Sequence, residues 1–176
     1  MAETKKSVSN KENLVDNVIS VRRVTKVTKG GKRFSFSALV VSGDKQGRVG
    51  IASGKSREVS QAISKATNKA RKRMIEIPLR DSTIPYDVKG KHGASKVVIR
   101  SASKGTGVIA GGAVRALMEV LGIKDILAKS IGSGNPQNVV KAALNALAKL
   151  RSVRRLAQLR GKTVTEIVGG KKDASA

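Results

Sequence analysis

The balance of charged side chains constrains this chain more than any other feature. Its 176 residues include 36 Lys and Arg residues but only 12 Asp and Glu residues, which gives a formal net charge of +24. Self-repulsion on this scale opposes compaction unless a polyanion neutralises it. The excess also runs through the whole chain, because residues 1–80 carry 19 basic and 6 acidic side chains and residues 81–176 carry 17 and 6. The charge therefore predicts a nucleic-acid partner first and an anionic membrane surface second.

The composition excludes several kinds of site. Cys is absent, which excludes disulfides, thiolate nucleophiles and Cys-based zinc sites. His92 is the single His, so a multi-His metal site is excluded as well, and we expect no cofactor, no metal and no catalytic residue. The apolar runs fall far short of the ~20 residues that a membrane span needs, and residues 1–10 lack the apolar core of a secretory signal. We therefore expect a soluble cytoplasmic protein without a membrane partner.

Two prolines mark the expected domain boundary. Pro78 and Pro85 bracket a break in the apolar pattern, and both ends of the chain are polar, charged or rich in small residues. The expected parts are a disordered N-terminal extension (1–13), an N-terminal RNA-binding domain (14–80), a C-terminal α/β domain (81–168) and a flexible tail (169–176).

Apolar periodicity in the first domain predicts an antiparallel meander followed by a helix. β-branched residues over 18–28, alternation from Phe34 to Val41 and a short run over 48–52 indicate three strands, and the turn at 29–32 joins the first two. The apolar positions 59, 62, 63, 66, 70 and 74 then mark one face of an amphipathic helix, with Ser56 as the expected N-cap.

The second domain is predicted to combine short strands with two helices. The expected elements are an extended segment at 84–88, a basic turn at 90–93, a buried strand at 97–99, a helix through 114–121, a strand near 126–128 and a helix through 139–147. Asn135 as N-cap and Pro136 at the first helical position open the last helix. The sequence therefore predicts an α+β fold with two small α/β domains.

Two segments resemble nucleotide-binding loops, and their spacing argues against both. Gly50 and Gly54 are separated by three residues, whereas a Walker loop needs four. The segment 105–110 fits a loose dinucleotide pattern, but Asp125, at about the right distance, precedes an apolar strand instead of ending one. We interpret the glycines of this second segment as residues that allow a tight turn and close helix approach.

Aromatic side chains are too few for a typical single-strand binder. The chain has Phe34, Phe36 and Tyr86 and no Trp, and strand alternation assigns both Phe residues to the core. Recognition of phosphate backbone and folded shape by Lys and Arg is the favoured interpretation. Because the basic residues are spread over both domains, folded RNA is favoured over a DNA groove. A DNA-binding architectural protein and a nucleotide-dependent enzyme remain as alternatives.

The candidate RNA-binding residues form three groups: the first hairpin, the start of the first helix and the basic turn around His92. In the hairpin, Gly30 and Gly31 let the backbone approach a partner closely. A helix start can hold a phosphate without Walker geometry. For His92, contact with RNA or phosphate is favoured over a plain solvated turn. The full set is Arg22, Arg23, Lys26, Lys29, Gly30, Gly31, Lys32, Arg33, Lys55, Arg57, Lys89, Lys91, His92 and Lys96.

Taken together, several segments resemble a known family. The segments are GKRFSF at 31–36, GD at 43–44, GRVG at 47–50, GKSREV at 54–59, GKHGA at 90–94, GTGVIAGGAVR at 105–115 and GSGNP at 132–136. As a set they are similar to the signature of the bacterial-type small-subunit ribosomal protein S-five family, over about residues 14–168 and in the family's order.

The resemblance implies a fold for each domain. The first is expected to be like the double-stranded-RNA-binding fold, with a three-stranded antiparallel sheet and a helix. The second is expected to have a small sheet, two helices and a left-handed crossover, against the usual right-handed rule.

The resemblance also implies a role. It implies a structural constituent of the small subunit of a bacterial-type ribosome that binds folded ribosomal RNA, helps to hold body and head and influences translational accuracy. The hairpin from Arg22 to Arg33 corresponds to the family's RNA-contacting loop, which is associated with the spectinomycin response. Implied partners are ribosomal proteins S-four and S-eight, with the messenger entry path nearby. The residues expected to face S-four are Gly105, Thr106, Gly107 and Arg115.

Overall fold

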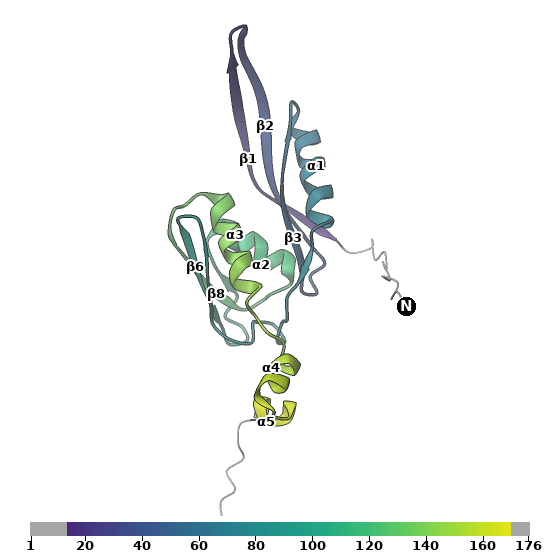
Figure 1. Ribbon diagram of the computed structural model, residues 1–176, viewed down its shortest axis with the longest axis vertical. Coiled ribbons are helices and arrows are strands. Elements are labelled where there is room, and N and C mark those ends of the chain that lie inside the picture. Colours follow the sequence, from purple (N-terminus) through teal and green to yellow (C-terminus); the bar gives the residue numbers. More distant parts are fainter. Residues whose placement is uncertain (1–13, 170–176) are drawn as a thin grey trace, which may run out of the picture. The chain divides into compact units, whose positions relative to one another are not determined.

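A long antiparallel meander forms from the β-branched and alternating segments near the start of the chain (Figure 1). The computed structural model describes residues 14–169. Its first sheet contains, in order, β1 (Val15–Thr28), β2 (Gly31–Gly43), β3 (Arg48–Ser56) and β4 (Ile75–Glu76). Each strand pairs antiparallel with the next. The three predicted strands are confirmed, and the two-residue β4 is an addition.

Helix α1 (Val59–Arg71) covers one face of this sheet, and bare backbone lets it approach closely. A Cβ on Gly50 would lie 2.1 Å from the backbone oxygen of Ala70, and one on Gly54 would lie 2.3 Å from that of Ala62. Only glycine fits at such separations. The buried cluster below the helix consists of Ala38, Val40, Ala62 and Ala66, with Phe36 and Ile63 packed against it.

The predicted cap of α1 is wrong. The N-cap residue is Glu58, whose side chain makes no capping hydrogen bond. Ser56 is the last residue of β3, and its hydroxyl donates to the side-chain oxygen of Gln61 over 3.0 Å. Pairing with Phe36 holds Ser56 in extended conformation, so β3 continues to the residue that was expected to cap the helix.

The described chain divides into two compact units that do not follow the sequence continuously. One unit contains the chain up to Glu76 together with Arg115–Gly122, and the other contains Ile77–Val114 and the chain from Ile123 onward. In the first unit, the amide of Lys45 donates to the carbonyl oxygen of Val120 near the end of α2 (Gly112–Leu121), over 3.1 Å. This return of the chain had no signal in the sequence pattern.

The second sheet has the strand order β5 (Val88–His92), β6 (Ser95–Ser101), β8 (Ile126–Gly132) and β7 (Val108–Ile109). The first three strands pair antiparallel, whereas β7 and β8 are parallel. Helix α2 lies between β7 and β8 in the chain, as a strand–helix–strand crossover requires. The α+β fold class is therefore confirmed.

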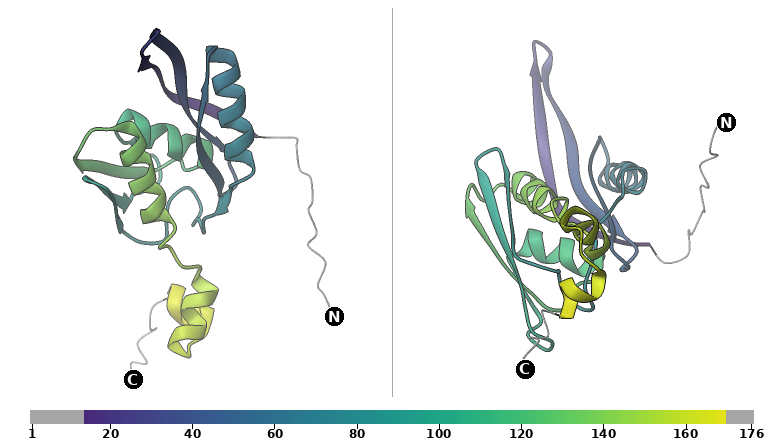
Figure 2. Two further views of the ribbon diagram at one scale, coloured as in Figure 1. Left: turned by 45° about the horizontal axis from the view of Figure 1, so that its top comes forward. Right: turned by 60° about the horizontal axis from the view of Figure 1, so that its bottom comes forward.

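Helix α3 (Pro136–Leu147) covers one face of the second sheet (Figure 2). It begins as predicted, because the Asn135 side chain accepts a hydrogen bond from the amide of Gln137 over 3.3 Å. Gly90 of β5 lies beneath the helix, where a Cβ would be 2.1 Å from the backbone oxygen of Ala142. Glycine again allows the helix to contact the strand backbone.

The predicted basic turn at 90–93 is wrong in its extent. Residues 90–92 belong to β5, where Gly90 pairs with Val97 and His92 pairs with Ser95. Only Gly93 and Ala94 form the turn. Ladder hydrogen bonds with β6 hold the glycine and histidine in extended backbone, which their composition alone does not reveal.

Two short helices that were not predicted follow α3. Helix α4 (Val153–Arg160) begins at Ser152, which caps it, and ends at Gly161, whose φ of 60° is left-handed. Helix α5 (Val164–Gly169) includes Gly169, where the flexible tail was predicted to begin. The rest of that tail and the predicted extension at 1–13 lie outside the described residues. From residue 14 to residue 169, no helix is long and apolar enough to cross a membrane.

Candidate nucleic-acid interface

The β1–β2 hairpin continues beyond the part of the first sheet that other elements cover (Figure 1). The last pair between β2 and β3 joins Phe36 to Ser56. Residues 24–35 therefore form a free two-stranded ribbon, which we call the arm. No side chain of the arm is fully buried, and Lys29 and Gly30 form its turn.

The glycines at the tip serve the turn in two ways. Gly31 has a φ of 120°, which side chains rarely allow, and Thr28 Oγ1 donates to its carbonyl oxygen over 3.1 Å. Gly30 has nothing within 4 Å of the position that a Cβ would occupy. The predicted tight reversal is confirmed, and the backbone at Gly30 lies bare at the tip.

One face of the hairpin carries cationic side chains, together with Val24 and small residues. Directly opposed residues of an antiparallel pair point to the same face. Lys26 is opposite Arg33, and Arg22 is opposite Ser37, which is in turn opposite Lys55 of β3. Arg22, Lys26, Arg33 and Lys55 therefore share the face that points away from α1. We call these four residues the basic face.

The other face of the hairpin combines cations with apolar side chains. The Arg23 guanidinium carbon lies 3.8 Å from the centroid of the Phe34 ring, a cation–π contact. Phe34 is 46% exposed and Val27 is 71% exposed. We call Arg23, Thr25, Val27, Lys32 and Phe34 the mixed face. The prediction that Phe34 packs in the core is wrong, because no element within residues 14–169 covers the hairpin beyond Phe36, which does pack there.

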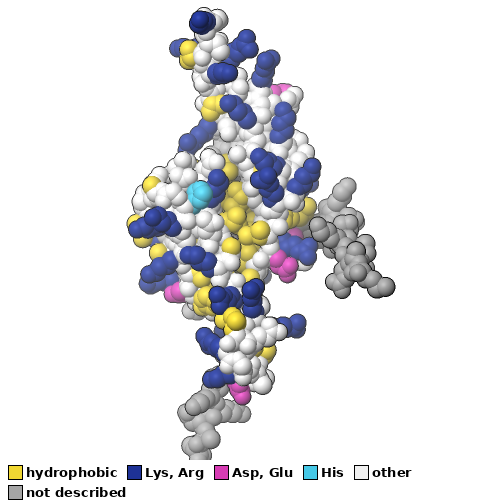
Figure 3. All heavy atoms as spheres, in the orientation of Figure 1, with side chains coloured by type: hydrophobic (Ala, Val, Ile, Leu, Met, Phe, Trp, Pro, Cys, Tyr) yellow, Lys and Arg dark blue, Asp and Glu magenta, His cyan; other side chains and the backbone are white. Residues whose placement is uncertain are grey.

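The cations of the hairpin have no acidic partner in the described residues. The salt bridges within residues 14–169 join Arg71 to Asp16, Arg100 to Asp87 and Arg115 to Glu119. Residues 17–43 contain neither Asp nor Glu. Figure 3 shows Lys and Arg side chains along the hairpin at the top of the view. The hairpin charge is therefore not neutralised within this part of the chain.

Lys55 does not lie at the helix start where it was predicted, whereas Arg57 directly precedes the N-cap Glu58. Lys55 belongs to β3, and Arg57 lies in the short link before Glu58. Gly54 is explained by its contact with α1, so the segment that resembles a phosphate-binding loop is a strand end. Lys55 instead lies on the same face of the sheet as Arg22, with Ser37 of β2 between them, and both side chains are exposed.

In the second sheet, the register places three predicted RNA-binding lysines on one face. Lys91 is opposite Lys96, and Lys89 is opposite Val98, which is opposite Lys129 of β8. This open face is the one that α3 does not cover, because the alternate residue Gly90 lies under the helix. Alternation along β8 could have identified Lys129 as a further residue of this face, although it is not among the predicted RNA-binding residues.

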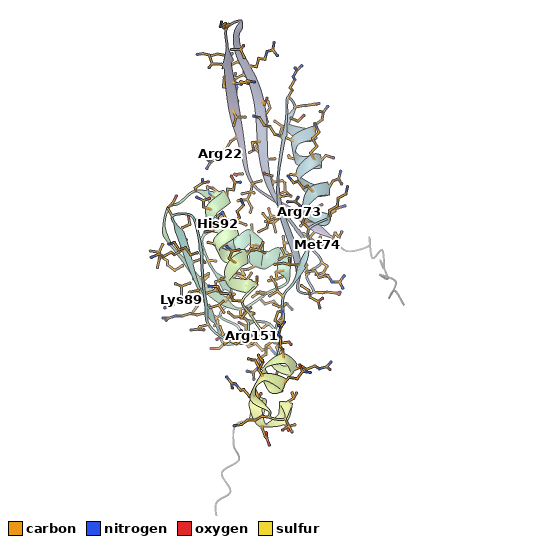
Figure 4. All side chains as sticks on the ribbon, viewed as in Figure 1. Arg22, Arg73, Met74, Lys89, His92 and Arg151 are labelled. Atoms are coloured by element: carbon orange, nitrogen blue, oxygen red, sulfur yellow. The ribbon has the colours of Figure 1, made fainter. Side chains whose placement is uncertain are left out.

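The open face also carries exposed apolar side chains. Ile131, opposite Lys96, is 54% exposed, and Ile109 and Leu127, which pair with each other, are 55% and 38% exposed. His92 lies on the opposite side of the sheet from the lysines and is half-buried (Figure 4). The expected grouping of His92 with these lysines is therefore wrong.

The glycine-rich loop before α2 is held by a buried carboxylate. Asp125 is 4% exposed, and its Oδ1 accepts hydrogen bonds from the amides of Gly105 and Gly107, both over 3.0 Å. The hydrogen bond from the Ser82 side chain, followed by those from the loop amides, lowers the pKa of Asp125. Both glycines have positive φ, which confirms the predicted tight turn.

Other features of this loop differ from the expectation. Gly105, Gly107 and Gly111 have nothing within 4 Å of a Cβ position among the described residues, so the predicted close approach of a helix does not occur at them, and Gly112 is itself the first residue of α2. The sequence pattern presents Asp125 only as a possible cofactor ligand and does not reveal its role as an anchor.

The four residues predicted to face a partner protein are divided between the units. Gly105, Thr106 and Gly107 belong to the second unit, and Thr106 Oγ1 donates to the carbonyl oxygen of Ser103 over 2.8 Å. Arg115 belongs to the first unit and pairs with Glu119 one helical turn later, at 2.9 Å. The exposed loop and the exposed arginine are therefore two separate features of the described structure.

Comparisons with known proteins identify the family of the chain. The model of the ribosomal protein S5 N-terminal domain matches residues 14–78, and the model of the S5 C-terminal domain matches residues 90–160. The chain is 57% identical over 154 residues to small ribosomal subunit protein uS5 of Syntrophobacter fumaroxidans, covering 88% of this chain and 93% of the relative. It is 53% identical over 159 residues to uS5 of Dinoroseobacter shibae, covering 90% and 82%. The chain belongs to the ribosomal protein S5 family.

Proposed function

We propose that the arm and the basic face hold phosphates of folded ribosomal RNA in the small subunit. As a member of its family, the chain is a structural constituent of the small ribosomal subunit and is not an enzyme. The observation that carries the proposal is the uncompensated charge of the hairpin. Residues 17–43 contain six Lys and Arg residues and no acidic residue.

The strongest support comes from the pair of Lys26 and Arg33. Like charges directly opposite each other destabilise a strand pair. Neither residue has an acidic partner in residues 14–169, and both side chains are exposed. A phosphate placed between the two side chains would convert repulsion into two charge-assisted contacts. The arrangement is suited to a polyanion.

The basic face provides a continuation of this site toward the body of the sheet. Arg22 and Lys55 lie on the same face, at a level four residues along the strands from the Lys26–Arg33 pair. Arg57 follows in the link to α1, and Lys29 and Lys32 lie at the tip. We infer that Gly30 and Gly31 bring the bare backbone of the tip close to the RNA.

We assign Lys89, Lys91 and Lys96 to a second RNA-binding surface, to which Lys129 belongs by register. For the functional division of the chain we keep an N-terminal RNA-binding domain at 14–80 and a C-terminal domain at 81–168. His92 remains a candidate RNA contact at the end of β5. It does not belong to the lysine surface, because its side chain lies on the other side of the sheet.

The finer partners follow from the family and belong to the proposal. We propose that the exposed loop at Gly105, Thr106 and Gly107, together with Arg115, faces ribosomal protein S-four. Protein S-eight would be a further neighbour, with the messenger entry path nearby. In this position the protein would help to hold body and head and would influence translational accuracy. The open space around the loop glycines supports a protein contact there.

Binding of small-subunit ribosomal RNA by the full-length protein tests the main proposal. If ~6–10 phosphates are neutralised, affinity should fall by about 10³–10⁵ between about 50 and 200 mM salt, by extrapolation from duplex DNA. Replacing Lys29, Lys32 and Arg33 by Ala should reduce the salt slope by up to about one unit per lost phosphate contact.

The same variant should fold normally, because these side chains are exposed and contribute to no core. Its thermal unfolding midpoint should change little. Crosslinking in assembled small subunits should then attach ribosomal RNA to the hairpin. An unchanged affinity and salt slope in the normally folded variant would show that the hairpin is not an RNA-binding element.

A further inference from the structure

We propose that the mixed face of the hairpin binds one unpaired nucleobase, which stacks on the ring of Phe34. The inference rests on the proposed RNA-binding function and specifies its ligand, because it requires a base that is not paired in a helix. Phosphate contacts alone involve the basic face on the other side of the same ribbon. The arm would therefore contact the backbone with one face and a base with the other.

The ring of Phe34 is available for a partner. It is 46% exposed even though the Arg23 guanidinium already lies 3.8 Å from its centroid. Its directly opposed neighbour is Thr25, a small side chain, and its diagonal neighbours across the strands are Arg23 and Val27. Val27 is 71% exposed and extends the apolar surface toward the tip. Phe34 and Val27 therefore form an exposed apolar surface beside a guanidinium.

Packing among residues 14–169 does not explain this surface. The buried cluster of the first unit includes Phe36 as a packed neighbour, and beyond that residue β1 and β2 pair only with each other within residues 14–169. In the described part of the chain, Phe34 and Val27 therefore leave apolar area in water that contact with a partner would remove. Phe36, two residues along the same strand, shows the contrast because it packs against the cluster under α1.

The surrounding charge indicates what the partner is. Arg23 and Lys32 lie on the mixed face itself, and Lys26 and Arg33 lie on the reverse. An apolar peptide would leave these cations without partners, whereas RNA provides phosphates on both sides of any base. Every base has a π face that stacks on aromatic rings, and arginine adds a cation–π contribution. A base within a continuous helix already has both faces covered, so the ligand must be unpaired.

The test compares two RNA hairpins that differ in one feature. One has a fully paired stem, and the other has the same stem with a single bulged 2-aminopurine, whose fluorescence is quenched on stacking. The full-length protein should bind the bulged hairpin about 5- to 150-fold more tightly, since stacking on an aromatic is worth that much per base. Binding should also quench the 2-aminopurine.

Variants separate the base contact from the phosphate contacts. Phe34→Leu keeps an apolar side chain but removes the ring, so it should lose both the preference and the quenching while keeping the salt slope. Phe34→Tyr should retain both. Lys26→Ala, on the reverse face, should weaken binding to both hairpins and lower the salt slope by about one, with the preference unchanged.

The outcomes distinguish this inference from the proposed function. Equal, steeply salt-dependent binding of both hairpins by the unmodified protein would overturn the base site and leave the phosphate contacts standing. Retention of the preference by Phe34→Leu, with a normal unfolding midpoint, would overturn the role of the ring. Absent or salt-independent binding of both RNAs would overturn the base site and the proposed function together.

Discussion

The two sheets of this protein bury one face by the same means and differ in what they leave uncovered. In the first sheet α1 rests on Gly50 and Gly54, and in the second sheet α3 rests on Gly90. The strands differ in length, because β1 and β2 have 14 and 13 residues whereas β5 and β6 have 5 and 7. The long strands extend past their helix, and the short ones do not.

Because of this difference, the cations of the first sheet lie beyond its packed core, whereas those of the second sheet lie on the strands that form its core. In the arm, the side chains lie beyond the helix-covered core, so cations can be concentrated there without burying any of them. On the open face of the second sheet, Lys89 and Lys96 lie on strands whose other face is core, and Ile131 is exposed beside them. We therefore expect the arm to dominate the salt dependence and the second face to contribute less.

The shared packing should give the largest effect on stability. A methyl group at Gly54 or Gly90 meets backbone atoms within 2.3 Å, so Gly54→Ala and Gly90→Ala should each lower the free energy of unfolding by about 1–3 kcal/mol. Gly30→Ala is the matched control, since nothing lies near its Cβ position, and it should stay within about 0.5 kcal/mol. Urea denaturation measures all three. If the three variants are equally stable, the helices do not rest on the strand backbone as described.

The second face provides an intermediate effect that sharpens the comparison. Replacing Lys89, Lys91 and Lys96 by Ala should lower the salt slope for ribosomal RNA by about one, less than the arm variant does. The charge-matched control replaces the exposed Lys65, Lys69 and Lys72 near α1. If both triple variants change the slope equally, the effect comes from net charge and the open face is no specific surface. Salt titration of RNA affinity decides between them.

The smallest expected effect concerns acid stability of the loop that Asp125 anchors. Hydrogen bonds from Ser82 and the loop amides lower the pKa of this carboxyl in the folded protein. Its contribution to stability is therefore complete above the unfolded pKa, near pH 4, and is lost as pH falls through the lower folded pKa. Asp125→Asn keeps an acceptor but has no charge, so its stability should change less between pH 6 and pH 2 than that of the unmodified protein. Identical pH profiles of the unfolding midpoint would contradict this role.

Local patterns were sufficient for most of the fold. Alternation located β1, β2 and β3, and Asn135 followed by Pro136 located the start of α3, because these signals depend on neighbours along the chain. The errors in secondary structure occurred where hydrogen bonds to a neighbouring strand fix the backbone conformation. Ser56 looked like a cap and His92 looked like part of a turn, yet pairing with Phe36 and Ser95 holds each of them in a strand.

The candidate site shows the same division. The basic hairpin is recognisable from sequence because its charge is local and has no acidic residue within it. The assignment of Phe34 to the core was wrong, because alternation identifies the face of a side chain and cannot tell whether a helix covers that position. The anchor at Asp125 was missed, because its partners at Gly105 and Gly107 are 20 and 18 residues earlier in the chain.

The sequence by itself determined the class of partner, the α+β elements and the family, since charge, periodicity and ordered motifs are properties of the chain as written. Only the tertiary structure decided how far each helix covers its sheet, and thereby which side chains stay exposed. Burial depends on contacts between residues distant in sequence, such as Gly54 with Ala62 and Gly90 with Ala142. The arm is free because the glycine contacts place α1 over the base of the hairpin, and the β2–β3 pairing ends at Phe36.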